Sequence, residues 1–234
     1  MKKTVIILIL VFTCFFVSSG IAQFQIGPIV GANLSGLSID PDIQGNINTK
    51  TGFAAGAVII YNFTSMFSLQ LEPTYMQKGA KLHIPYTDFG LILEVEQTIE
   101  LNYIDIPVLF RVSFGEEFIK PYLLAGGYIA FPLEDGKTTL DNLIGNGQDI
   151  TELLPDEVLD QFKPELITNS IDYGLNFGAG IDFPLGIIDL FLEAQYSLGL
   201  STLTDEEFFI FPDILNPEIK NKGFQVKAGI LFTL

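Results

Sequence analysis

A chain of 234 residues is long enough for one domain, and its net charge of −16 argues against a nucleic-acid partner. Only 17% of its residues are charged, against about 25% in a typical soluble domain. Beyond the N-terminus, no run of about 18 apolar residues is present that could form a spanning helix. A mean hydropathy of +0.40 without such a run is typical of a transmembrane β-barrel, in which only every second residue faces lipid.

The first 22 residues have the pattern of a cleaved export signal. Lys2 and Lys3 precede an apolar core at residues 5–17, and small residues ending at Ala22 form the cleavage site. We therefore expect a signal peptide at residues 1–22 and one barrel domain at residues 23–234. The only cysteine, Cys14, lies in the signal, so the mature chain would have no thiol and no disulfide.

Strand patterns recur along the mature chain. In order, they occupy residues 24–34, 53–63, 67–75, 101–112, 118–131, 171–183, 188–200 and 224–234. The clearest is 171–183, where apolar residues such as Leu175 and Phe177 alternate with Asp, Gly or Asn over 13 positions. A strand of this length suits a bilayer, which needs about 9–11 tilted residues. Residues 101–112 and 118–131 are apolar at both odd and even positions, so the pattern does not determine which of their side chains point inward.

The connections between these segments alternate in length. Short turns are predicted at residues 62–65, 114–117 and 184–187, and long connections at 36–50, 79–96, 132–170 and 202–222. Short periplasmic turns and long extracellular loops are typical of bacterial outer-membrane barrels. The third long connection has room for a short helix at 155–162 and for a further hairpin. We predict a closed antiparallel barrel of eight strands, and ten strands remain an alternative.

The composition of the polar face predicts which side points inward. This face consists mainly of Gly, Ser, Asn, Thr and Gln, which suit a narrow lumen better than the surface of a soluble barrel. In lipid every backbone group must be paired internally, which favours a closed sheet. Aromatic girdles are expected at both interfaces, one of them formed by tyrosines at the ends of strands near the long loops. These tyrosines are Tyr75, Tyr103, Tyr128, Tyr173 and Tyr196.

Four segments resemble the PorT-like outer-membrane β-barrel family of Bacteroidetes. They are residues 27–35 (GPIVGANLS), 101–109 (LNYIDIPVL), 120–127 (KPYLLAGG) and 173–180 (YGLNFGAG), of which the second and third are the more specific. The resemblance covers nearly the whole mature chain and places an acid at Asp105. It implies an eight-stranded barrel in the outer membrane, and it implies little about activity.

Charged residues on the inward face form the candidate site. They are Glu72, Asp105, Arg111, Asp172, Asp182, Asp189, Glu193 and Lys227. An eight-stranded barrel is wide enough only to be filled with side chains, and buried charges are tolerated when they are paired. We therefore interpret these residues as a salt-bridge network that fills the lumen. A proton path, or a carboxylate pair acting as acid and base, is the alternative.

Catalytic and metal-binding patterns are weak. The only histidine, His83, would have to serve a catalytic site at the barrel rim, and no Gly-x-Ser-x-Gly motif is present. Residues 141–149 lack the ligand spacing of a calcium loop, and one histidine without cysteines does not make a zinc site. We expect no catalytic residue, no metal site and no cofactor, and keep a rim enzyme as a remote alternative.

These observations predict a non-enzymatic outer-membrane barrel with a side-chain-packed lumen. Acidic residues concentrate in the third and fourth long connections, which would display them outside the cell. The expected role is structural or an interaction within the envelope, through a monomer in contact with outer-membrane lipid and with an envelope protein bound by the long loops. A narrow porin, or a barrel that binds a small apolar ligand, is the alternative.

Overall fold

The computed structural model describes residues 23–40, 46–88, 91–115, 118–159, 171–203, 209–211, 214–215 and 218–234. The signal peptide predicted at residues 1–22 lies outside these residues and stays a prediction. Among the described residues, no helix is long and apolar enough to cross a membrane.

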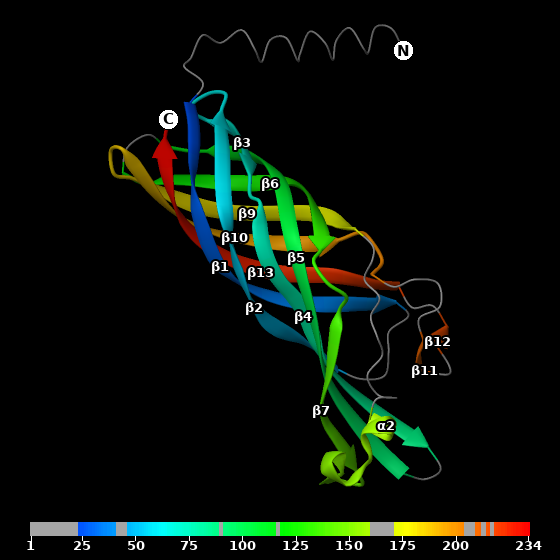
Figure 1. Cartoon of the computed structure of the whole chain (residues 1–234). Helices are drawn as coiled ribbons and strands as arrows, with labels where there is room; N and C mark the ends of the chain where they lie inside the picture. Colours follow the sequence, from blue (N-terminus) through cyan, green and yellow to red (C-terminus); the bar gives the residue numbers. More distant parts are fainter. Residues whose placement is uncertain are drawn as a thin grey trace, which may run out of the picture.

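The described residues form an antiparallel sheet that closes on itself (Figure 1). Its wall strands are β1 (Gln23–Asp40), β2 (Asn46–Asn62), β3 (Phe67–Leu71), β4 (Thr74–Asp88), β5 (Leu91–Ser113), β6 (Lys120–Pro132), β9 (Asp172–Pro184), β10 (Ile188–Gly199) and β13 (Glu218–Thr233). β2 pairs with β1 on one side and with β3 and β4 on the other, and β3 and β4 both pair with β5. From β5 onward each wall strand pairs with the next, and β1 closes the ring by pairing with β13. The wall is therefore a complete barrel.

Strands β3 and β4 together make one stave of this wall. Ile60 pairs with Gln70 and Gly56 pairs with Thr74, so the register on β2 is unbroken across Glu72 and Pro73. Counting β3 and β4 as one stave, the ring has eight members, as predicted.

The connections differ in length between the two ends of the barrel, as predicted. Short turns follow β2, β5 and β9, and β1 begins and β13 ends at this same end (Figure 1). At the other end, the connections predicted at residues 36–50 and 79–96 are mostly strand, because β1 runs to Asp40 and β4 to Asp88. These connections are long, as predicted, but they are not irregular loops, since their described residues stay paired in strands beyond the barrel.

A small sheet extends beyond the barrel at this second end. β7 (Lys137–Gly145) pairs with the outer half of β5, and a short hairpin joins it to β8 (Gln148–Asp149). The 3-10 turn η1 (Thr151–Leu153) and helix α2 (Asp156–Leu159) follow, and β11 (Phe209–Phe211) pairs separately with β12 (Ile214–Leu215). Of these extra strands only β7 pairs with β5, whereas β8 pairs with β7 and β11 with β12, so the wall itself gains no member. The helix predicted at 155–162 is described only as far as Leu159.

The barrel wall has its apolar side chains outside. On β9, Tyr173, Leu175 and Phe177 are exposed whereas Asp172 and Asn176 are buried. The same alternation holds on β10 and β13. This is the inverse of a soluble protein, and it places apolar residues against lipid and polar residues in the lumen, as the composition of the polar face predicted.

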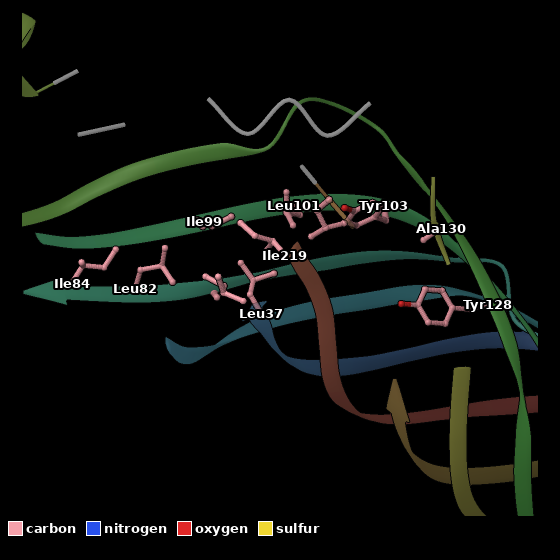
Figure 2. Packing of buried hydrophobic residues seen from close by; sticks show 12 residues of the cluster. Leu37, Leu82, Ile84, Ile99, Leu101, Tyr103, Tyr128, Ala130 and Ile219 are labelled. Atoms are coloured by element: carbon pink, nitrogen blue, oxygen red, sulfur yellow. The ribbon is translucent and has the colours of Figure 1, made fainter. Parts of the chain in front are cut away.

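The face that points inward becomes apolar at the second end. Twelve buried residues form a cluster there: Leu37, Ile39, Ala80, Leu82, Ile84, Ile99, Leu101, Tyr103, Tyr128, Ala130, Leu203 and Ile219. Figure 2 shows that their side chains converge between the extensions of β4 and β5 and the ends of β1 and β13. We call this cluster the mouth core. Tyr103 and Tyr128 belong to it, so their assignment to an outer aromatic girdle was wrong: both rings face inward.

Candidate functional site in the barrel lumen

The central group of the lumen joins three strands through Glu72, Glu193 and Lys227. The Lys227 ammonium on β13 forms an ion pair with Glu72, and it lies 3.4 Å from Glu193 Oε1 on β10. All three side chains are buried. One ammonium thus contacts two carboxylates. If both carboxylates are ionised, this contact alone leaves one negative charge unpaired.

Two glutamines complete this central group. Gln70 Nε2 donates to Glu72 Oε1 at 2.5 Å and to Glu193 Oε2 at 3.0 Å. Gln195 Nε2 donates to Glu193 Oε1 at 2.9 Å and to Glu72 at 3.1 Å. Tyr122 OH also donates to Glu193 Oε2, at 3.1 Å. The carboxylates are therefore held by amide and hydroxyl donors as well as by the ammonium, which reduces the free energy needed to bury them.

A second ion pair lies beside the central group. The Arg111 guanidinium pairs with Asp182, and its Nη1 donates to Gln70 Oε1 at 2.9 Å, which connects the two groups. The guanidinium also stacks on the Tyr122 ring, 3.5 Å from the ring centroid. Tyr122 in turn fits because residue 180 is glycine: a Cβ there would lie 2.3 Å from Tyr122 Cζ. The small residues of the polar face thus make room for the ring.

A third group lies next to the mouth core and centres on a lysine that sequence reasoning missed. Lys78 Nζ is 3.5 Å from Asp105 Oδ1 and 3.1 Å from Asp172 Oδ2. It sits over the rings of Tyr103 and Tyr128, at 5.0 and 4.5 Å from their centroids. Lys78 is an even-numbered residue of the same stave as Glu72, so strand alternation would have placed it on the inward face. It was overlooked because the strand was predicted to end near residue 75.

Asp172 is the best-satisfied carboxylate of this third group. Ser201 Oγ donates to Asp172 Oδ1 at 2.8 Å, and Asn221 Nδ2 donates to Oδ2 at 2.9 Å. Tyr128 OH lies 3.3 Å from Oδ1. Together with Lys78, these donors surround the carboxylate, so that its oxygens face protein groups.

The structure thus brings together seven of the eight predicted site residues in three neighbouring groups. The eighth, Asp189, stands apart near the short turns, is half-buried, and accepts a hydrogen bond from Gln25 Nε2 at 2.8 Å. Asp189 has lumen parity but lies in the rim, where no cation pairs with it among the described residues.

Apolar side chains lie on both sides of the charged groups. The mouth core lies toward the second end, and a cluster of Ile29, Val58, Ile60, Phe191 and Leu231 lies toward the short turns. A further cluster, of Leu109, Tyr122 and Leu124, packs beside Arg111. Chemically, this arrangement holds the charges in fixed groups between apolar layers, and donors from strands across the lumen reach carboxylates such as Glu72 and Asp182.

His83, the residue of the remote enzymatic alternative, lies far along β4 in the extension. Its Nδ1 is 3.3 Å from Glu96 Oε1 and its Nε2 is 3.8 Å from Glu94 Oε2. Asn142 Nδ2 on β7 donates to Glu96 Oε2 at 2.7 Å, and this hydrogen bond, with a smaller contribution from His83, lowers the pKa of Glu96. Within the described part of the chain, no group of three His, Cys, Asp or Glu residues is arranged to hold a metal ion.

The comparison with protein families decides what kind of barrel this is. Residues 18–205 match the family model described as the outer membrane protein beta-barrel domain. The chain belongs to this family. It is therefore an outer-membrane β-barrel protein, in agreement with the outward apolar face. No curated protein sequence is similar enough to this chain to give a match.

Solved structures of similar fold are distant. OprG from Pseudomonas aeruginosa is 12% identical, with 91% of this chain and 96% of that chain covered and a TM-score of 0.48. Neisserial surface protein A is 12% identical, with coverages of 89% and 96% and a TM-score of 0.43. Ail of Yersinia pestis is 13% identical, with coverages of 90% and 99% and a TM-score of 0.37. The family match alone supports the assignment.

Proposed function

We propose that this outer membrane beta-barrel domain protein is a non-enzymatic barrel whose lumen is closed by packed side chains. The observation that supports this most directly is the lumen itself, where three ionic groups are buried between two apolar clusters. An eight-stranded barrel is expected to have an interior just wide enough for side chains to fill. Ions would have to displace both the paired charges and the apolar layers in order to pass.

Planar-bilayer conductance of the refolded protein tests this closed lumen. We expect no stable conductance steps above the bare bilayer, with a conducting porin in the same bilayers as positive control. Stable, ion-selective steps would contradict the proposal and favour the narrow porin.

We further propose that the extension of β4, β5 and β7 stands outside the cell and serves structural or interaction roles in the envelope. Its outer surface is polar and largely acidic, with exposed Glu100, Glu134, Asp135, Asp141 and Asp149. Charged residues of this kind suit a surface in water and disfavour burial in lipid. An envelope protein is the partner that we propose for it.

The orientation can be tested with two epitope insertions. One is placed at Gly147, in the exposed β7–β8 turn, and the other at Gly186, in the turn between β9 and β10. Antibody should label the first on intact cells and the second only after permeabilisation. The opposite labelling pattern would show that the barrel has the reverse orientation in the membrane, with the extension in the periplasm.

Membership of the PorT-like group is proposed on the four segments quoted above. They lie on β1, β5, β6 and β9, which make up half of the wall. This likeness suggests no activity of its own, because the residues that carry it are those that build the strands.

A further inference from the structure

The lipid-facing wall has a groove over β6, β9, β10 and β13. Its volume is about 530 Å³, and its apolar lining includes Leu123, Ala179, Ile181, Leu192, Ala194 and Val226. These side chains have outward parity, and three of them, Leu123, Leu192 and Val226, are counted among the exposed large hydrophobic residues of the wall. Phe114 and Pro121 line the end of the groove nearest the short turns.

The register of the sheet explains why the wall is hollow here. Leu123 pairs with Ala179, Ala179 pairs with Ala194, and Ala194 pairs with Val226, so one row crosses four strands. The two central positions of this row are alanines, with a larger side chain at either end. The adjacent row toward the short turns contains Ile181 and Leu192, which are larger. Two neighbouring alanines therefore form the floor and bulkier side chains form the walls.

The contents of such a groove follow from its surroundings. It lies in the half of the wall nearer the periplasmic turns, on a face that contacts acyl tails in an outer-membrane barrel. Water would find almost no polar partner there, and an empty groove would lose the dispersion contacts of its lining. Apolar side chains continue from it to the periplasmic rim: Phe118, Ile119, Leu185, Ile187 and Leu234 are exposed there.

We propose that this groove binds one acyl chain of a phospholipid in the periplasmic leaflet. The headgroup would lie at the rim, and the acyl chain would run along the alanine floor between Leu123 and Val226. This lipid differs from the other lipids around the barrel because it occupies a shaped site, whereas the others contact a convex surface. The inference rests on the membrane location and on the orientation proposed above, and it is independent of whether the lumen conducts.

The absence of tryptophan from the sequence allows a direct test. Phe114→Trp places a reporter at the groove, and Phe24→Trp places one on β1, outside the groove, with similar exposure of the original side chain (43% and 49%). Each protein is kept in detergent micelles and titrated with phosphatidylcholine carrying dibrominated acyl chains, which quench tryptophan on contact. We expect quenching at position 114 to saturate near one lipid per protein, and quenching at position 24 to rise gradually.

Filling the groove provides the decisive comparison. Ala179→Leu with Ala194→Leu, in the Phe114→Trp background, should abolish the saturable step. Ala125→Leu with Ala228→Leu is the matched control, since both alanines face outward but do not line the groove. Far-UV circular dichroism checks that all variants are folded.

Several outcomes would overturn the proposal. One is the same gradual quenching at positions 114 and 24, and another is a saturable step that survives the filled groove. A dimer in sedimentation experiments that Ala179→Leu with Ala194→Leu dissociates would assign the groove to a second copy of the chain.

Discussion

The barrel wall and the extension beyond it use the same strands with opposite polarity. On β5, the outward residues within the wall are Phe110 and Val108, whereas in the extension they are Asn102, Glu100 and Thr98. The inward residues change in the reverse sense, from Arg111 and Asp105 to Tyr103, Leu101 and Ile99. Since the parity of the strand does not change, the surrounding medium determines the polarity of each face.

This inversion shows where the strand leaves the lipid. It falls between Ile104 and Asn102 on β5, and on β13 it falls between Phe224 and Lys220. Beyond it the inward face needs no charges, because the inward side chains of β4 and β5 pack there against those of β1 and β13 in the mouth core (Figure 2). The extension thus has the arrangement of a water-soluble fold, with an apolar buried face and a polar exposed face.

The largest effect is expected from removing a charge inside the wall. Lys227→Met leaves Glu72 and Glu193 buried without their ammonium, and breaking a buried ion pair in this way costs about 3–5 kcal/mol. Urea unfolding in lipid vesicles, followed by circular dichroism, would measure the loss.

Lys220→Met is the matched control on the same strand. Lys220 lies in the extension, where its ion pair with Glu218 is exposed to solvent. Its replacement should leave the unfolding midpoint unchanged. Equal losses for the two variants would mean that the lumen charges are not sequestered from water.

A cavity in the mouth core should destabilise the extension selectively. Leu101→Ala removes a buried side chain, and such changes cost about 2–5 kcal/mol. Hydrogen exchange should show faster exchange for β4, β5 and β7 amides of the extension, with little change in β9 and β10. Leu175→Ala, on the lipid face of β9, is the control, and faster exchange throughout the wall after Leu101→Ala would show that the two regions unfold together.

Arginine introduced at two outward positions of β5, one in the wall and one in the extension, tests the inversion of polarity between these two regions. Val108→Arg places a charge against lipid, which costs about 2–4 kcal/mol near the bilayer midplane. Thr98→Arg has the same parity, but it lies in the extension beside Asp141 and should be tolerated. Unfolding free energies in vesicles would compare them, and equal tolerance of both would place Val108 outside the membrane.

The wall could be predicted from the sequence because strand parity is a local property. Residues 171–183 predicted β9 (Asp172–Pro184) to within a residue at each end, and every second residue there faces as the alternation required. The reversal of polarity on β4 and β5 was not predicted, because a strand that becomes inward-apolar outside the membrane looks like the end of the alternation. Lys78 on β4 was missed and Tyr103 on β5 was misplaced for this reason, and Tyr128 was misplaced because the inward face of β6 also joins the mouth core.

The partners within the lumen could not be predicted at all. Parity places Glu72 and Lys227 on the inward face, but these residues are 155 positions apart, and their contact depends on the closure of the whole ring. The pairing of β7 with β5 is equally non-local, and it follows from an edge of β5 that exists only because β5 extends past the end of β6.

The smallest effect concerns one carboxylate on the outer surface of the extension. The pKa of Glu96 lies below its ordinary value of 4.5 because Asn142 Nδ2 donates to its carboxylate, and His83 lowers it further. A lowered pKa in the folded state stabilises the extension above the unfolded pKa, and this contribution is lost as pH falls through the folded pKa. Asn142→Ala should therefore raise the pKa of Glu96, as NMR titration of its carboxyl carbon in micelles would measure.

The same pair provides a stability test with a definite sign. The difference in extension stability between wild type and Asn142→Ala should be present at neutral pH and shrink on acidification below about 4.5, since Glu96 is then protonated in both proteins. Thr139→Ala, an exposed change on the same strand, controls for general effects on β7. A stability difference that stays constant down to low pH would mean that Asn142 stabilises the extension through β-strand packing. It would also mean that the hydrogen bond from Asn142 does not stabilise the ionised carboxylate of Glu96.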